Sequence, residues 1–294
     1  MPATSVTCIF SPYHVGLRDH RVGDGPNRIR DMGIVVQLEN LGIKVHQHEL
    51  PRVDDSEGEI GRSFALLAHT SQAVSRAVAA LSFPLVLSGN CMASAGVACG
   101  LEIEDLGFVY FDAHDDMETP EWNTNGYLDA MGLSMLNGRS WEKIARTIPG
   151  FRPFDFGRFV YCGLREVCDE SRLRVAEAGA DVVWGGVERK VDFAAELQAR
   201  LEAKDYSPAL VHLDLDVLDE TVGKVNGYES AGGLTEEDLV KCMGMVPLKT
   251  TPKSLTVCSF DPNLGDGDKI AAIGVRAVVE FMASLLESGV LRKA

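Results

Sequence analysis

Short apolar runs alternate with longer segments of helical period along almost the whole chain, and this alternation limits the possible folds most strongly. Strands that alternate with helices predict βαβ units, and therefore a mostly parallel sheet with helices on both faces. The 294 residues contain no linker, low-complexity tract or repeat of fixed period, so we expect one three-layer α/β/α domain over residues 1–294. The expected strands are residues 6–10, 44–50, 84–87, 107–111, 159–162, 181–184, 210–213 and 255–259, and the clearest helices are 26–41, 64–81 and 269–286.

Net charge limits the possible binding partners, and cysteine usage indicates the cellular compartment. The formal net charge of −15 argues against nucleic acid or an anionic membrane as a partner, because both bind clustered Lys and Arg. The seven cysteines are scattered and form no Cys-x-x-Cys pair, which is typical of a reducing compartment. The sequence starts without a basic leader, and no apolar run reaches the roughly 18 residues of a membrane span. We therefore expect a cytoplasmic protein.

Three potential metal ligands follow the strand expected at 107–111. Asp112, His114 and Asp116 stand at alternate positions, and such positions point to the same face of an extended chain. They can therefore converge on one point. A solvated acidic loop is the alternative interpretation of this segment.

A second polar face follows in residues 211–216. His212, Asp214 and Asp216 share one face of an apolar strand, where an isolated buried carboxylate costs several kcal/mol. Either this strand has a wet face at a sheet edge, or it lies centrally and holds a cation. Carboxylates from both segments would repel one another without positive charge. Hard oxygen ligands with imidazole suit Mn²⁺, or less well another divalent ion, and shared carboxylates suit two metals.

Three segments resemble motifs of the ureohydrolase superfamily, which comprises arginases, agmatinases and formiminoglutamases. They are Asp-Ala-His-Asp-Asp at 112–116, Asp-Leu-Asp-Val-Leu-Asp at 214–219 and Gly-Gly-Leu-Thr at 232–235, with weaker similarity at 23–26 and 161–165. The resemblance implies an arginase-like fold and two Mn²⁺ ions per chain. It also implies that a metal-bridging hydroxide hydrolyses the guanidino or amidino group of a small molecule.

The same resemblance implies a role for each ligand. Asp112 and Asp214 would bridge the two metals, Asp116 would complete one metal, and His114 with Asp216 would complete the other. Members of the superfamily are often oligomeric, so a homo-oligomer is a further expectation.

Three positions depart from the superfamily's metal and catalytic residues. Cys91 stands where the first metal-ligating His is expected, and a thiolate favours Zn²⁺ or Fe²⁺ over Mn²⁺. Alternatively, Cys91 is a small buried residue at a strand-to-helix turn. A minor branch of the superfamily carries Cys there and is associated with N-hydroxylated arginine. Asp129 replaces the proton-shuttle His, and Asp238 stands for the Glu that grips the guanidinium, unless Asp238 is only a helix-terminal acid.

The substrate-binding positions depart as well. Glu118 and Asn125 stand where arginases bind the α-carboxylate, and Cys168 stands where they bind the α-amino group. Glu118 would repel a carboxylate by about 4 kcal/mol at roughly 4 Å and an effective dielectric constant of 20. The sequence therefore favours an arginine-derived guanidino metabolite other than free L-arginine.

Two other functions compete with this one. The first is a non-catalytic arginase-like protein that holds one metal or none and acts as a binding or regulatory subunit. The replacement of a ligand His by Cys91 and of the shuttle His by Asp129 motivates it. The second is a zinc deacetylase, which the absence of adjacent histidines disfavours.

Overall fold

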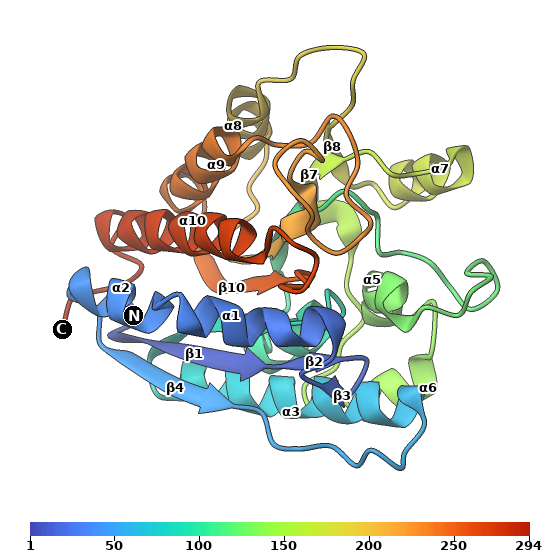
Figure 1. Cartoon of the computed structure of the whole chain (residues 1–294), viewed down its shortest axis with the longest axis horizontal. Helices are drawn as coiled ribbons and strands as arrows, with labels where there is room; N and C mark the ends of the chain where they lie inside the picture. Colours follow the sequence, from blue (N-terminus) through green and yellow to red (C-terminus); the bar gives the residue numbers. More distant parts are fainter.

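An eight-stranded sheet forms the centre of the molecule in a computed structural model that describes residues 1–294 (Figure 1). All paired neighbours in this sheet run parallel, and each expected strand is confirmed. A separate antiparallel hairpin lies outside it. In spatial order the strands are β4 (Val45–Glu49), β1 (Ser5–Ser11), β5 (Ser82–Ser88), β10 (Pro252–Cys258), β9 (Ala209–Asp214), β6 (Gly107–Phe111), β7 (Phe159–Leu164) and β8 (Asp181–Trp184), and the hairpin is β2 (Tyr13–His14) with β3 (Leu17–Arg18).

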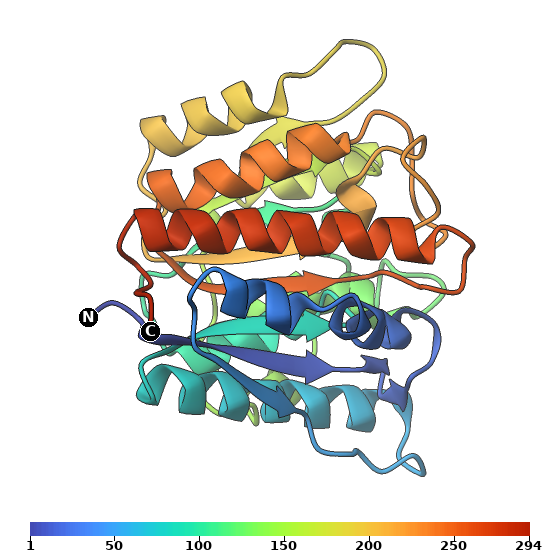
Figure 2. The ribbon, with the colours of Figure 1, turned by 60° about the vertical axis from the view of Figure 1, so that its left-hand side comes forward.

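Helices cover both faces of the sheet and give the expected three layers (Figure 2). Side chains alternate along each strand, so that Val211 and Leu213 of β9 enter one apolar core and Leu210 enters the other. The first core contains residues of α1 (Gly25–Asp31), α2 (Ile34–Asn40), α8 (Phe193–Ala203), α9 (Glu236–Lys249) and α10 (Gly267–Glu287). The second contains residues of α3 (Glu59–Ala79), α4 (Ala93–Leu101), α5 (Gly132–Leu136), α6 (Glu142–Ala145) and α7 (Asp169–Glu177).

The helix expected at 26–41 is two helices, and that prediction was wrong in detail. The chain leaves α1 after Asp31 and re-enters a helix at Ile34. Gly33 between them has φ +81°, a left-handed conformation that glycine adopts without steric cost. Short 3-10 turns, which the apolar periodicity did not predict, are η1 (Arg21–Asp24), η2 (Leu128–Met131), η3 (Phe156–Arg158) and η4 (Leu215–Val217).

The strand order determines which loops meet. Strands β5, β10, β9 and β6 are adjacent in the sheet although their order in the sequence is different. In a parallel sheet, the carboxyl ends of neighbouring strands open onto one edge, where ligands of α/β proteins usually bind. The polar residues after these four strands therefore share one edge. None of the helices combines the length and the apolar character that crossing a membrane requires.

Candidate active site

The turn after β5 places Cys91 at this edge. Gly89 in the turn packs so closely that a Cβ there would lie 2.2 Å from the carbonyl oxygen of Tyr13. The chain then turns into α4 and leaves Cys91 only 4% exposed. Its Sγ lies 2.7 Å from Asp214 Oδ2, so the structure brings Cys91 to the carboxylates that follow β9.

The residues after β6 converge as their alternation predicted. Asp112 is fully buried, and its Oδ1 accepts a 2.7 Å hydrogen bond from the backbone N–H of His114. His114 Nδ1 lies 3.5 Å from Asp112 Oδ1 and 3.3 Å from Asp216 Oδ2. Asp116 takes a positive φ of 51°, and its Oδ2 accepts a 2.7 Å hydrogen bond from the hydroxyl of Tyr110. The solvated-loop alternative does not describe this segment, because both carboxylates are buried.

The residues after β9 complete the carboxylate cluster. Asp214 ends the strand, and its Oδ1 accepts a 2.7 Å hydrogen bond from the backbone N–H of Asp216. Asp216 Oδ2 accepts a 2.8 Å bond from the side chain of Asn226. Strand β9 is central rather than at an edge of the sheet, so the wet-face alternative does not hold and the polar face is buried.

Two donors in the cluster were absent from the predicted ligand set. His212 is fully buried on β9, and its Nε2 lies 3.7 Å from Asp112 Oδ2. Cys258 ends β10, and its Sγ lies 3.3 Å from Cys91 Sγ. His212 had a signal in the sequence, since it shares the polar face of β9 with Asp214. No such signal marks Cys258, which is a single cysteine at the end of an apolar strand.

Burial and mutual repulsion hold several of these carboxyl groups at unusually high pKa. Burial raises the pKa of Asp112 to about 7. It also raises the pKa of Asp214 and of Asp116 well above the usual range, and neighbouring aspartates add to both shifts. The pKa of Asp216 is instead lowered, because the attraction of His114 outweighs its burial. The cluster therefore lacks positive charge beyond what His114 can supply.

The donor set fits divalent metal ions. Asp112 Oδ2 and Asp216 Oδ1 are buried without a hydrogen-bond partner, which is costly for a carboxylate oxygen. Asp112, His114 and Asp216 offer donor atoms that lie within 4.8 Å of one another, and so do Cys91, Asp112, Asp116 and His212. Two neighbouring groups of oxygen, nitrogen and sulfur donors can hold two ions.

A cavity of about 200 Å³ opens onto this cluster. Its lining contains seven carboxylates and no Lys or Arg, so its field favours a cation over an anion. The carboxylates are Asp115, Asp116, Glu118, Asp129, Glu166, Asp214 and Asp216, and the remaining lining residues are Cys91, His114, Asn123, Asn125, Tyr127, Ala130, Ser171, Asn226, Tyr228 and Ser259.

Asp129 lies in this cavity and is firmly held. It belongs to η2, is 4% exposed, and accepts hydrogen bonds of 2.8 Å from Met92 N–H and 2.7 Å from the Asn90 side chain. Burial raises its pKa in spite of these bonds. A carboxyl with a raised pKa is a better proton donor near neutral pH than an ordinary aspartic acid.

The structure separates the other predicted substrate contacts. Glu118 and Asn125 line the cavity, on the loop between β6 and η2. Cys168 is exposed at the start of α7 and is not among the lining residues. Asp238 lies outside the cavity too, in a capping box in which its carboxylate accepts from the backbone N–H and hydroxyl of Thr235. This placement favours the helix-terminal interpretation of Asp238.

Arg165, within the 161–165 segment that carries weaker resemblance, fixes the loop behind the cluster. Its guanidinium is buried and donates to the carbonyl oxygens of Asp216 and Leu218, each at 3.0 Å, and of Val217 at 3.2 Å. It therefore orients the backbone that carries Asp216 and has no contact with the cavity.

The chain is similar to known arginases and to a related amidino hydrolase over almost its whole length. The profile of the arginase family matches residues 11–284. The arginase of Bacillus subtilis is 25% identical over 296 residues, which cover 96% of this chain and 97% of that protein. Its crystal structure superposes with a TM-score of 0.84 at 22% identity, covering 95% of this chain and 98% of the other. The proclavaminate amidino hydrolase of Streptomyces clavuligerus gives a TM-score of 0.72 at 18% identity, covering 98% and 94%.

Proposed function

The chain belongs to the arginase family, whose members are hydrolases of amidine carbon–nitrogen bonds, and from this premise we propose that it is a two-metal hydrolase of a guanidino compound. The observation that carries the proposal is the buried carboxylate cluster at the floor of an acidic cavity. The cluster needs cations, and the cavity walls suit a cationic guanidinium group.

The residues of the cluster would each contribute ligands to the two ions. Asp112 and Asp214 would lie between the two ions, His114 and Asp216 would hold one ion, and Cys91 and Asp116 would hold the other. When bound, divalent ions of this kind supply water whose pKa is lowered toward neutrality. Mn²⁺ suits the oxygen-rich group, and the thiol of Cys91 gives its ion a softer environment.

Asp129 would serve the substrate rather than the metals. Its two hydrogen bonds leave carboxylate lone pairs free to accept from the N–H groups of a guanidinium. Its raised pKa suits it to hold a proton at Oδ for the nitrogen that departs. With Asp238 in a helix cap, we assign both the guanidinium contact and the proton transfer to Asp129.

The walls of the cavity argue against free L-arginine as the substrate. Glu118 and Glu166 line the cavity and no lysine or arginine does. Arg174 beside the cavity is already paired with Asp115 at 3.0 Å. Asn125 also lines the cavity and can donate from Nδ2, but its amide is neutral and cannot offset the charge of the two glutamates. An arginine-derived compound with a blocked or missing carboxylate therefore fits the cavity better.

Metal analysis followed by a substrate screen tests the proposal. We expect two ions per chain, and urea and an amine released from agmatine or an arginine-containing cyclic dipeptide. L-Arginine and N-hydroxyarginine, which both keep the free α-carboxylate, should react poorly. Asp112→Asn and Asp214→Asn should lose metal and activity, whereas Asp181→Asn on the edge strand β8 should keep both. A chain that binds one ion or none and releases no product would instead be a non-catalytic family member, such as a binding or regulatory subunit.

A further inference from the structure

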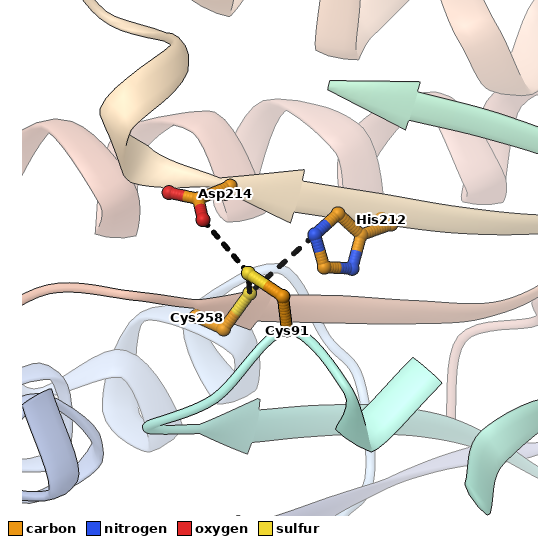
Figure 3. Close-up of side chains that lie close together, drawn as sticks. All are labelled: Cys91, His212, Asp214 and Cys258. Carbon is orange, nitrogen blue, oxygen red and sulfur yellow. Dashed lines mark hydrogen bonds between the residues drawn. The ribbon is translucent and has the colours of Figure 1, made fainter. Parts of the chain in front are cut away.

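Four potential ligands at the ends of three adjacent strands form a compact group, as Figure 3 shows, and two of them, Cys91 and Asp214, line the cavity. His212 and Asp214 share one face of β9, Cys258 ends β10 and Cys91 follows β5. Strand β10 lies between β9 and β5, and Cys258 is in register with Asp214. One donor atom from each of the four residues lies within 4.8 Å of the others.

The spacing of these atoms is close to that of a tetrahedral zinc shell. Zinc–sulfur bonds of about 2.3 Å and zinc–nitrogen bonds of about 2.0 Å place neighbouring donors roughly 3.4–3.8 Å apart. The two Sγ atoms are 3.3 Å apart, and Cys258 Sγ lies 3.6 Å from His212 Nε2. Cys91 Sγ and Asp214 Oδ2, at 2.7 Å, would need to separate by about 1 Å or less.

The surroundings of His212 orient it as a ligand. Its Nδ1 lies 2.7 Å from the Ser94 hydroxyl, which fixes the ring and leaves Nε2 toward Cys258. Its ring also stacks on Tyr110. Metal-binding histidines generally use their second nitrogen in this way, in a hydrogen bond that sets the orientation of the ring.

We propose that Cys91, Cys258, His212 and Asp214 form a closed, four-coordinate zinc site. Two thiolates and an imidazole are softer than the oxygen-rich set of Asp112, His114 and Asp216, and thiolates select Zn²⁺ over Mn²⁺. Four protein donors also fill the tetrahedral shell, which is typical of zinc sites that leave no position for water. All four residues are buried, whereas the His114 side chain is 32% exposed. The zinc would therefore be the inner, inert ion, and the outer group would hold the ion that faces the substrate.

This inference shares Cys91 and Asp214 with the proposed function and rests on it to that extent. It revises the shell of the Cys91 ion, because Cys258 and His212 take the places given above to Asp112 and Asp116. It also assigns different metals to the two positions. Metal coordination can be measured without a substrate, so the two proposals can fail separately.

The test uses Co²⁺ as a spectroscopic substitute for Zn²⁺ in the full-length, metal-stripped protein. We expect one strongly bound Co²⁺ with an ultraviolet thiolate-to-cobalt charge-transfer band. Cys258→Ser and Cys91→Ser should each remove about half of that band, and the double variant should remove all of it. Cys168→Ser changes an exposed thiol away from the cluster and should keep the full band. Zn²⁺ should displace the Co²⁺, and Mn²⁺ in excess should not.

X-ray absorption at the zinc edge of the wild-type protein covers the case in which a variant does not fold. Two sulfur scatterers at about 2.3 Å are expected. A shell of nitrogen and oxygen alone, an unchanged band in the double variant, or displacement by Mn²⁺ would each overturn the proposal. So would a disulfide between Cys91 and Cys258, detected as the loss of two free thiols in the denatured chain. A thiolate-bound zinc in a chain that hydrolyses no guanidino compound would support this site and contradict the proposed function; turnover with Mn²⁺ and no thiolate band would do the reverse.

Discussion

The ring of Tyr110 lies flat against the imidazole of His212, with centroids 3.8 Å apart and planes inclined by only 5°. The two residues are in register on the neighbouring strands β6 and β9. The hydroxyl of Tyr110 also donates to Asp116 at 2.7 Å. Tyr110 therefore orients one potential metal ligand from each polar segment: His212 from residues 211–216 and Asp116 from residues 112–116.

Tyr110→Phe should keep the ring stack and remove the hydrogen bond to Asp116. We expect the free energy of unfolding to fall by about 1–3 kcal/mol, because a buried carboxylate loses a partner. Metal affinity should fall roughly 10- to 100-fold, because Asp116 loses the bond that orients it. Urea denaturation and metal titration measure the two effects. Tyr161→Phe is the matched control, since its hydroxyl donates to the Asp115 carbonyl and touches no proposed ligand. Equal losses of metal affinity in both variants would contradict the role of Tyr110.

Ser94→Ala should weaken zinc binding without removing a ligand. The Ser94 hydroxyl lies 2.7 Å from His212 Nδ1, and loss of such a partner typically costs 10- to 100-fold in affinity. Competition with a chromophoric chelator measures the change. Ser71→Ala removes another buried hydroxyl, which donates to the Pro149 carbonyl, and should leave zinc affinity as it is. If Ser94→Ala binds zinc as tightly as the wild type, His212 is not held for coordination.

Metal binding should release protons near neutral pH. In the metal-free chain burial raises the pKa of Asp112 to about 7, and the pKa values of Asp116 and Asp214 are also raised. These groups must ionise to bind metal, so affinity should rise with pH through about 7 and fall as they become protonated below it. Isothermal titration in two buffers of different ionisation enthalpy counts the protons released. The prediction fails if the binding enthalpy is the same in both buffers at pH 6.5.

Glu118 should discriminate against substrates that carry an α-carboxylate. We expect kcat/KM for free L-arginine to lie at least about a thousandfold below that for the best guanidino compound without a carboxylate. Glu118→Gln should narrow this gap, since it removes the repulsion and keeps the shape. Glu121→Gln, at an exposed position of the same loop outside the cavity, is the control. Efficient turnover of L-arginine by the wild type would refute this account of specificity.

The central strands were predictable because each is a short apolar run between polar or glycine-containing turns, whereas the edge strand β4 is polar and partly exposed. Such an apolar run is buried on both faces and cannot lie at the surface. Its position in the sequence is therefore enough to assign it to the sheet. The helix at 26–41 was predicted less well. Its apolar stripe continues past Gly33, and periodicity alone does not show that the backbone there is left-handed.

The proposed metal ligands divide in the same way. Asp112, His114 and Asp116 are close in sequence and alternate, so local geometry was enough to group them. Cys91 and Cys258 are separated by 167 residues, and their proximity depends on β10 lying beside β5. Strand order is a tertiary property, and a lone cysteine after an apolar strand carries no sign of it. Asp238 differs from these residues. Its match to a family motif suggested a substrate contact, but in the structure its carboxylate forms the capping box of α9.

The proposed metal ligands and the substrate wall come from different kinds of backbone. The ligands stand at or just after the ends of central strands, whereas Glu118, Asn123, Asn125 and Tyr127 all come from residues 117–127, the part of the loop between β6 and η2 that follows the last ligand. This part of the substrate wall can therefore be exchanged as a module. Grafting residues 117–127 from a relative with another specificity should retune which molecule is accepted and leave the chemistry intact, so a small library of transplanted loops is a practical route to new enzymes on this scaffold.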